Sequence, residues 1–197
     1  SLRYAFGNGF AVFGSAAYTE VMPIIDDLEF PGRVTHSEKS RSYEVGFSYE
    51  RRGALRAGDQ LALKVNYFDS ELWDVNAFVD ATAAQNPLEE IRTEGVEIEA
   101  SYAMDNGFYV DLNATLAEGE EVTQAGLVSD WRNQAADNLR LTVGKVFNDI
   151  YDLSWEVVSA DAITVNGVRD EGYTAHNLRA TIAPKGKGVW ENTEFRV

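Results

Sequence analysis

The sequence TEGVEIEASYAMDNGFYVDLNATL, residues 93–116, alternates apolar and polar side chains along two arms. In the first arm, 96–102, Val, Ile, Ala and Tyr alternate with Glu, Glu and Ser, and the second arm, 108–116, alternates in the same way. A period of two is that of a β-strand, because successive side chains of a strand point to opposite faces. Between the arms, Asn106 and Gly107 supply the positive φ angles that a tight turn needs. The stretch therefore predicts an antiparallel β-hairpin.

The length and the two faces of this hairpin predict that it crosses a membrane. Each arm has about ten residues, close to the ~9–11 residues with which a tilted strand crosses a bilayer. One face carries hydrocarbon and aromatic side chains, and the other carries the carboxylates of Glu97 and Glu99. Transmembrane β-barrels have this pattern, with lipid outside and a wet lumen inside. We expect Ile98 to face lipid and Glu97 to face the lumen.

The rest of the chain repeats the alternation, most clearly at 42–51, 61–68 and 139–144. Short turns alternate with long polar connections, which we expect near 19–40, 70–92 and 118–137. A membrane barrel has this asymmetry, with tight turns at one rim and long loops at the other. The predicted fold class is all-β, an antiparallel transmembrane β-barrel segment of about nine strands.

Composition excludes several other classes of protein. The chain of 197 residues has 32 acidic and 17 basic residues, a net charge of −15 and no cysteine. Nucleic-acid binding is not expected, because phosphate contacts need clustered Lys and Arg. The sequence contains no run of 18 apolar residues that would predict a transmembrane helix.

Several segments resemble the C-terminal barrel of TonB-dependent outer-membrane receptors. These segments are 19–28, 38–50, 63–75, 92–120 and 172–186. The motif EGVEIEASY, residues 94–102, is the most specific part of the resemblance. The resemblance implies a location in the bacterial outer membrane, contact with outer-membrane lipid, and a complete barrel of about 22 strands. It further implies that 1–197 is a partial C-terminal barrel domain, without the plug domain and without the closing strands.

The same resemblance implies a transport function and no enzyme activity. Receptors of this family take up a large, scarce nutrient, such as a ferric siderophore or haem, with energy from the TonB complex that acts through the plug. The haem-uptake branch is the nearest, although Thr19-Glu20-Val21-Met22-Pro23 stands where that branch reads FRAP. Two alternatives stay open from the residues alone: a passive outer-membrane porin, and a soluble β-sheet adhesin or carbohydrate-binding module.

Candidate ligand-binding residues lie in the long connections, because loops at the outer rim meet solutes first. They are His36, Asp26, Asp27, Arg33 and Trp73. An imidazole such as that of His36 can ligate haem iron. We predict no catalytic residue, no metal site and no resident cofactor. The glutamates of the inner face at 44, 50, 97 and 99 are expected to be polar lining that pairs with Lys64, Arg140 or Arg179.

Overall fold

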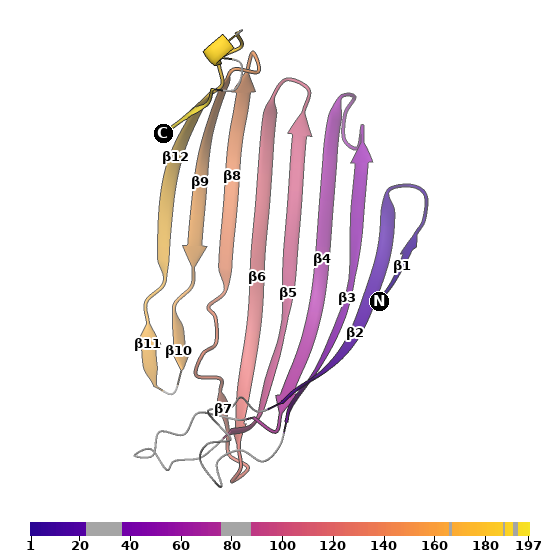
Figure 1. Ribbon diagram of the computed structural model, residues 1–197, viewed down its shortest axis with the longest axis vertical. Coiled ribbons are helices and arrows are strands. Elements are labelled where there is room, and N and C mark those ends of the chain that lie inside the picture. Colours follow the sequence, from indigo (N-terminus) through magenta and orange to yellow (C-terminus); the bar gives the residue numbers. More distant parts are fainter. Residues whose placement is uncertain (23–36, 76–87, 166, 187, 191–192) are drawn as a thin grey trace.

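The computed structural model describes the whole chain except residues 23–36, 76–87, 166, 187 and 191–192. Its main feature is one 11-stranded sheet in which every neighbouring pair is antiparallel (Figure 1). The sheet runs in the order β1 (Leu2–Ala5), β2 (Phe10–Val21), β3 (Glu38–Arg52), β4 (Asp59–Trp73), β5 (Leu88–Met104), β6 (Phe108–Thr123), β8 (Asn138–Phe147), β9 (Tyr151–Ala160), β12 (Tyr173–Ile182) and β13 (Phe195–Arg196). The all-β antiparallel fold class is confirmed.

Three short strands and one short helix complete the described structure. β7 (Val128–Asp130) pairs with the end of β6, and β10 (Ile163–Val165) pairs with β11 (Val168–Asp170) in a separate hairpin. The 3-10 helix η1 (Gly188–Trp190) follows β12. Among the described residues, no helix is both long enough and apolar enough to cross a membrane.

The predicted hairpin is confirmed as β5 and β6. Ile98 lies opposite Ala114, and Val96 lies opposite Leu116. In the turn, Gly107 has a φ of 85°, and the side-chain oxygen of Asn106 accepts a hydrogen bond from the backbone N–H of Phe108 at 3.1 Å. The left-handed backbone at Gly107 is one that residues with a Cβ rarely adopt, which explains the Asn-Gly sequence.

The long strands extend further toward the long connections than the sequence predicts. β4 continues to Trp73 and β5 already begins at Leu88, so both ends of the predicted connection 70–92 are strand. The predicted connection 118–137 likewise contains the end of β6 and the whole of β7. In these extensions both faces carry polar residues, so the hydrophobic alternation disappears although the backbone pairing continues.

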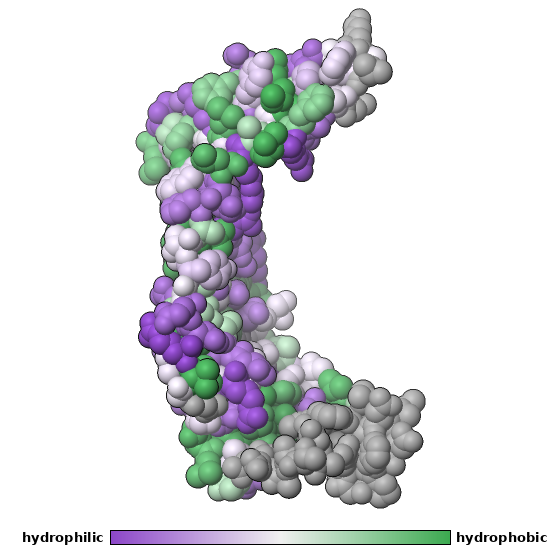
Figure 2. All heavy atoms as spheres, turned by 90° about the vertical axis from the view of Figure 1, so that its left-hand side faces the viewer, coloured by the Kyte–Doolittle hydropathy of each residue, from purple (hydrophilic) through white to green (hydrophobic). Residues whose placement is uncertain are grey.

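The two faces of the sheet differ as predicted. The registers put most of the strongly exposed apolar side chains of the long strands on one face, with Val21 and Tyr173 at strand ends as exceptions. The side chains on this face include Leu2, Tyr4, Val12, Tyr43, Val45, Tyr67, Leu116, Leu139, Leu153, Trp155 and Leu178. Figure 2 shows the sheet bowed, with hydrophilic residues along its hollow side. The hollow side is the inner, polar wall of a barrel, and the apolar face is the outer wall.

The two ends of the sheet also differ. The tight turns between β1 and β2, β3 and β4, β5 and β6, and β8 and β9 lie together at the top of Figure 1. β7 and the β10–β11 hairpin lie at the opposite end. We refer to the first end as the short-turn rim and to the second as the outer rim.

Aromatic rings on the inner wall lie over glycines of the neighbouring strands. The ring of Phe13 covers Gly46, and the ring of Tyr109 covers Gly144. The Tyr109 hydroxyl donates a hydrogen bond to Asp152 at 2.9 Å, which fixes its ring across β8. A glycine in a strand interior marks a place where another group approaches closely, and here that group is an aromatic ring.

We expect Gly144→Ala to destabilise the assembled barrel by roughly 1–3 kcal/mol, as overpacking of a filled site does. A Cβ at Gly144 would lie less than 3.0 Å from the Tyr109 ring. Equilibrium unfolding in lipid measures the effect. The control is Gly14→Ala, where the nearest atom is a backbone oxygen at 3.3 Å. Adding Tyr109→Ala to Gly144→Ala removes the clash, so equal losses with and without Tyr109 would contradict this packing.

Candidate functional site

The inner wall is lined by polar side chains that bond across neighbouring strands. The Ser15 hydroxyl donates to Glu44 at 3.2 Å, linking β2 to β3. The Lys64 ammonium donates to Glu99 at 3.3 Å, so the predicted pairing of Lys64 with an inner-face glutamate is confirmed. These cross-strand contacts connect the strands on the side that a solute would meet.

The most buried carboxylate of the inner wall is that of Glu156 in β9. Its side chain is 2% exposed. Arg140 of β8 bonds to its Oε2 at 2.6 Å, and Arg179 of β12 bonds to its Oε1 at 2.6 Å. The amide of Asn177 donates to the same Oε1 at 3.0 Å. Charge-assisted bonds of this kind are stronger than neutral ones, so Glu156 ties three strands together.

This arrangement corrects one prediction. Arg140 and Arg179 were expected to pair with glutamates 44, 50, 97 or 99, but they pair with Glu156. The reason is the register: Glu156 lies opposite Asn177 on one side and opposite Thr142 on the other, which places both arginines within reach. Alternation along a strand indicates the face of a side chain but not which strands flank it.

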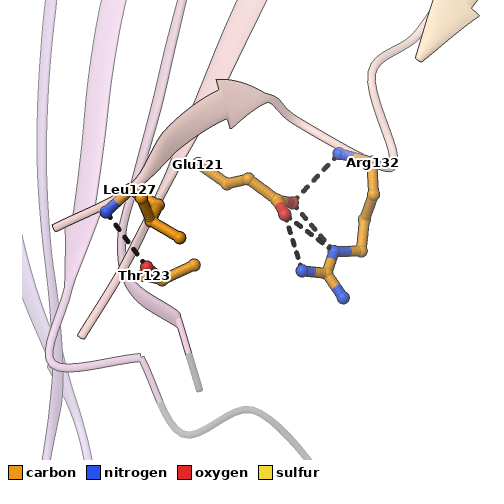
Figure 3. Close-up of polar contacts among 4 residues, drawn as sticks. All are labelled: Glu121, Thr123, Leu127 and Arg132. Atoms are coloured by element: carbon orange, nitrogen blue, oxygen red, sulfur yellow. Dashed lines mark hydrogen bonds and ion pairs between the residues drawn. The ribbon is translucent and has the colours of Figure 1, made fainter. Parts of the chain in front are cut away.

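At the outer rim, the chain after β6 folds back and is fastened by an ion pair (Figure 3). Arg132 donates four hydrogen bonds to Glu121: its backbone N–H donates to Oε2 at 3.1 Å, Nε to Oε2 at 2.8 Å and to Oε1 at 3.2 Å, and Nη2 to Oε1 at 2.6 Å. The turn between β6 and β7 is closed by the backbone N–H of Leu127, which donates to the Thr123 hydroxyl at 3.1 Å. Glu121 is therefore the anchor of this segment.

A cleft of about 470 Å³ opens beside this segment. It is bounded by the outer end of β6, by the chain leading into β8 and by β10. The charged residues of its lining are all acidic: Glu118, Glu120, Asp130, Asp137 and Asp161. Asp137 is engaged, because its Oδ1 accepts the backbone N–H of Ala117 at 3.0 Å. Within the described residues, no three His, Asp or Glu side chains form a group that could hold a metal ion.

The comparison with protein families agrees with a sheet whose outer face is apolar and whose inner face is polar. The family model described as TonB dependent receptor-like, beta-barrel, matches residues 1–195. The chain belongs to this family. TonB-dependent receptors are outer-membrane receptors of bacteria that take up nutrients, and the family is one of transporters rather than of enzymes. A comparison with curated proteins found no match.

In this receptor barrel, one of the five predicted ligand-binding residues lies in the described structure. Trp73 is the last residue of β4, not a loop residue. Its ring centroid lies 6.0 Å from that of Tyr18 and 5.9 Å from the guanidinium carbon of Arg41. The registers put Trp73 on the same side of the sheet as Tyr67, which is the outer face. Asp26, Asp27, Arg33 and His36 lie outside the described residues.

The Glu121–Arg132 pair predicts a pH-dependent outer rim in the receptor. Hydrogen bonds from Arg132 hold the pKa of Glu121 below its usual value, although burial of the carboxylate opposes this. A lowered carboxylate pKa gives stability that is complete above the ordinary Glu pKa of about 4.3 and is lost as the pH falls through the lowered pKa. We therefore expect the segment after β7 to loosen only below about pH 4.

Spin-label mobility at Asn133→Cys measures this loosening, since 1–197 contains no other cysteine. Arg132→Gln should move the transition to higher pH, because Glu121 loses the group that lowers its pKa. The matched control is Arg169→Gln on β11, which removes an exposed ion pair with Glu171. Identical transitions in the wild type and Arg132→Gln would show that this ion pair does not hold the segment.

Proposed function

We propose that residues 1–197 form part of the wall of an energy-coupled receptor for a large, scarce nutrient such as a ferric siderophore or haem. The observation that carries the proposal is the family match over residues 1–195. The polar inner wall and the apolar outer face support it, because they suit a solute path inside and lipid outside. A wide barrel with a wet interior is the form that a large solute requires.

The proposal includes further strands and a plug domain supplied by the complete receptor. β1 and β13 are the two edges of the sheet, and neither has a second partner strand among the described residues. In hydrocarbon, unpaired backbone groups have no water to bind, so the sheet must close with other strands. The TonB complex would supply energy through the plug.

For ligand capture we propose the loops of the outer rim, with Asp26, Asp27, Arg33 and His36 in one and Trp73 beside another. Anionic, cationic and imidazole groups together suit a polar iron chelate or haem. The reason for choosing loops is general: loops at the outer rim of a barrel meet solutes first.

Deleting residues 23–36 from the complete receptor tests the proposed function. We expect uptake of the nutrient to require a working TonB complex and to fall at least about tenfold after the deletion, an effect of about 1.4 kcal/mol. Growth on single iron sources, with and without the TonB complex, measures uptake. Heat-dependent gel migration checks that the barrel is assembled.

Three results would count against parts of this proposal. Uptake that does not depend on TonB and rises in proportion to solute concentration would identify a porin instead. Unchanged uptake in the 23–36 deletion would remove that loop from the binding site. Trp73→Ala with unchanged affinity would do the same for Trp73.

A further inference from the structure

We propose that Arg140 and Arg179 bind a compact anionic group, a carboxylate or a phosphate, of the solute that passes along the inner wall. Glu156 is the positioning residue, which holds both guanidinium groups in place. The inference rests on the proposed transport function and specifies the chemistry of its solute.

Arg140 and Arg179 are far more exposed than the carboxylate that they share. The Glu156 side chain is 2% exposed, whereas those of Arg140 and Arg179 are 52% and 51% exposed. The carboxylate is thus covered by its partners, while both guanidinium groups stay open to the inner side. If the ion pair only joined the strands, its arginine side chains would not need to be half exposed.

Both arginines keep N–H donors that Glu156 does not use. Arg140 uses Nε and Nη2 on Glu156, and Arg179 uses Nη2. A guanidinium has five N–H donors in a planar fork, so each arginine keeps donors for a second acceptor. Two guanidinium groups on one carboxylate also leave one positive charge in the cluster. Carboxylates and phosphates are the acceptors that this fork fits.

The cluster of Glu156, Arg140 and Arg179 lies on the inner wall of the sheet. Arg140 lies opposite Asn113, near the middle of β6 (Phe108–Thr123). Asn113, Arg140, Glu156 and Asn177 share the polar face that lines the hollow side of the sheet. The cluster is therefore below the outer rim and beside the path of a solute that has already entered.

The acidic residues around the cluster disfavour a solute with many negative charges. The chain has a net charge of −15, and the cleft at the outer rim is lined by carboxylates. A polyanion would be repelled before it reached Arg140 and Arg179, because like charges repel over about 10 Å at moderate salt. A solute with one compact anionic group on a neutral or cationic body avoids most of this repulsion.

Benzoate and its uncharged isostere benzamide are the probes that test the site. Saturation-transfer NMR on the complete receptor in detergent should show benzoate binding and at least about tenfold weaker benzamide binding. Arg140→Gln combined with Arg179→Gln should weaken benzoate binding at least about tenfold. Arg140→Lys combined with Arg179→Lys keeps the charge on Glu156 but loses the fork, and it should weaken binding by a smaller factor. Arg169→Gln is the control and should change nothing.

Two results would overturn the proposed anion site. Equal binding of benzoate by the wild type and by a folded Gln double variant would overturn the proposal and leave the cluster a structural ion pair. Benzoate binding that appears only after the plug is deleted would also overturn it, because a protein segment then covers the arginines. Gel migration of the Lys variant establishes that the barrel is assembled. A receptor that binds benzoate through the two arginines but shows no TonB-dependent uptake would refute the proposed function alone.

Discussion

Ile98→Lys is expected to destabilise the assembled barrel by roughly 2–4 kcal/mol, the cost of a lysine near the middle of the lipid-facing wall. Ile98 lies between Val65 of β4 and Ala114 of β6 on the outer face. An ammonium there would lie in hydrocarbon, with no carboxylate in either opposing position. Reversible unfolding of the complete barrel in lipid vesicles measures the loss.

Glu97→Gln is the matched control, one residue away on the opposite face. Among the described residues, the Glu97 carboxylate accepts one long hydrogen bond, from Asn66 at 3.5 Å. Its replacement by an amide keeps the shape and faces the wet inner side, so we expect less than about 0.5 kcal/mol. If Glu97→Gln were the more costly change, the two faces would be exchanged, since a shift of one residue moves every side chain to the other face.

Expressed as an isolated polypeptide, residues 1–197 are expected to aggregate in plain buffer. The outer face would present a broad apolar surface to water, with Val45, Leu116 and Leu178 at 59%, 51% and 82% exposure. The sheet would also present two edges with unpaired N–H and C=O groups, which template pairing with other chains. Size-exclusion chromatography and light scattering measure the association.

Detergent provides the control for this experiment. It covers the apolar face but does not pair the edge strands, so we expect detergent to slow association without giving a single species. The complete receptor, refolded in the same detergent, should be monodisperse. A soluble, monomeric 1–197 with cooperative unfolding in plain buffer would contradict the barrel assignment and support the soluble β-module.

Local sequence predicted the strands where the environment imposes alternation. In a barrel wall, one face of each strand meets lipid and the other meets the wet lumen. Apolar and polar side chains therefore alternate, as they do along the two arms of 96–116. Beyond the membrane both faces of a strand meet water. The sequence around Arg92, Glu94 and Glu118 therefore shows no hydrophobic alternation. This is why the outer ends of β4, β5 and β6 were predicted as loops and found as strands.

The sequence by itself determined the all-β class, the hairpin at Asn106-Gly107 and the polar and apolar faces. These features depend on residues close together in the chain, on turn geometry and on the medium that each face meets. Only the tertiary structure decided which distant side chains meet: Glu156 with Arg140 and Arg179, Glu121 with Arg132, and Tyr109 over Gly144. Such contacts depend on the order and register of neighbouring strands, and a pattern that repeats every two residues fixes the face of a side chain but not its partner across the sheet.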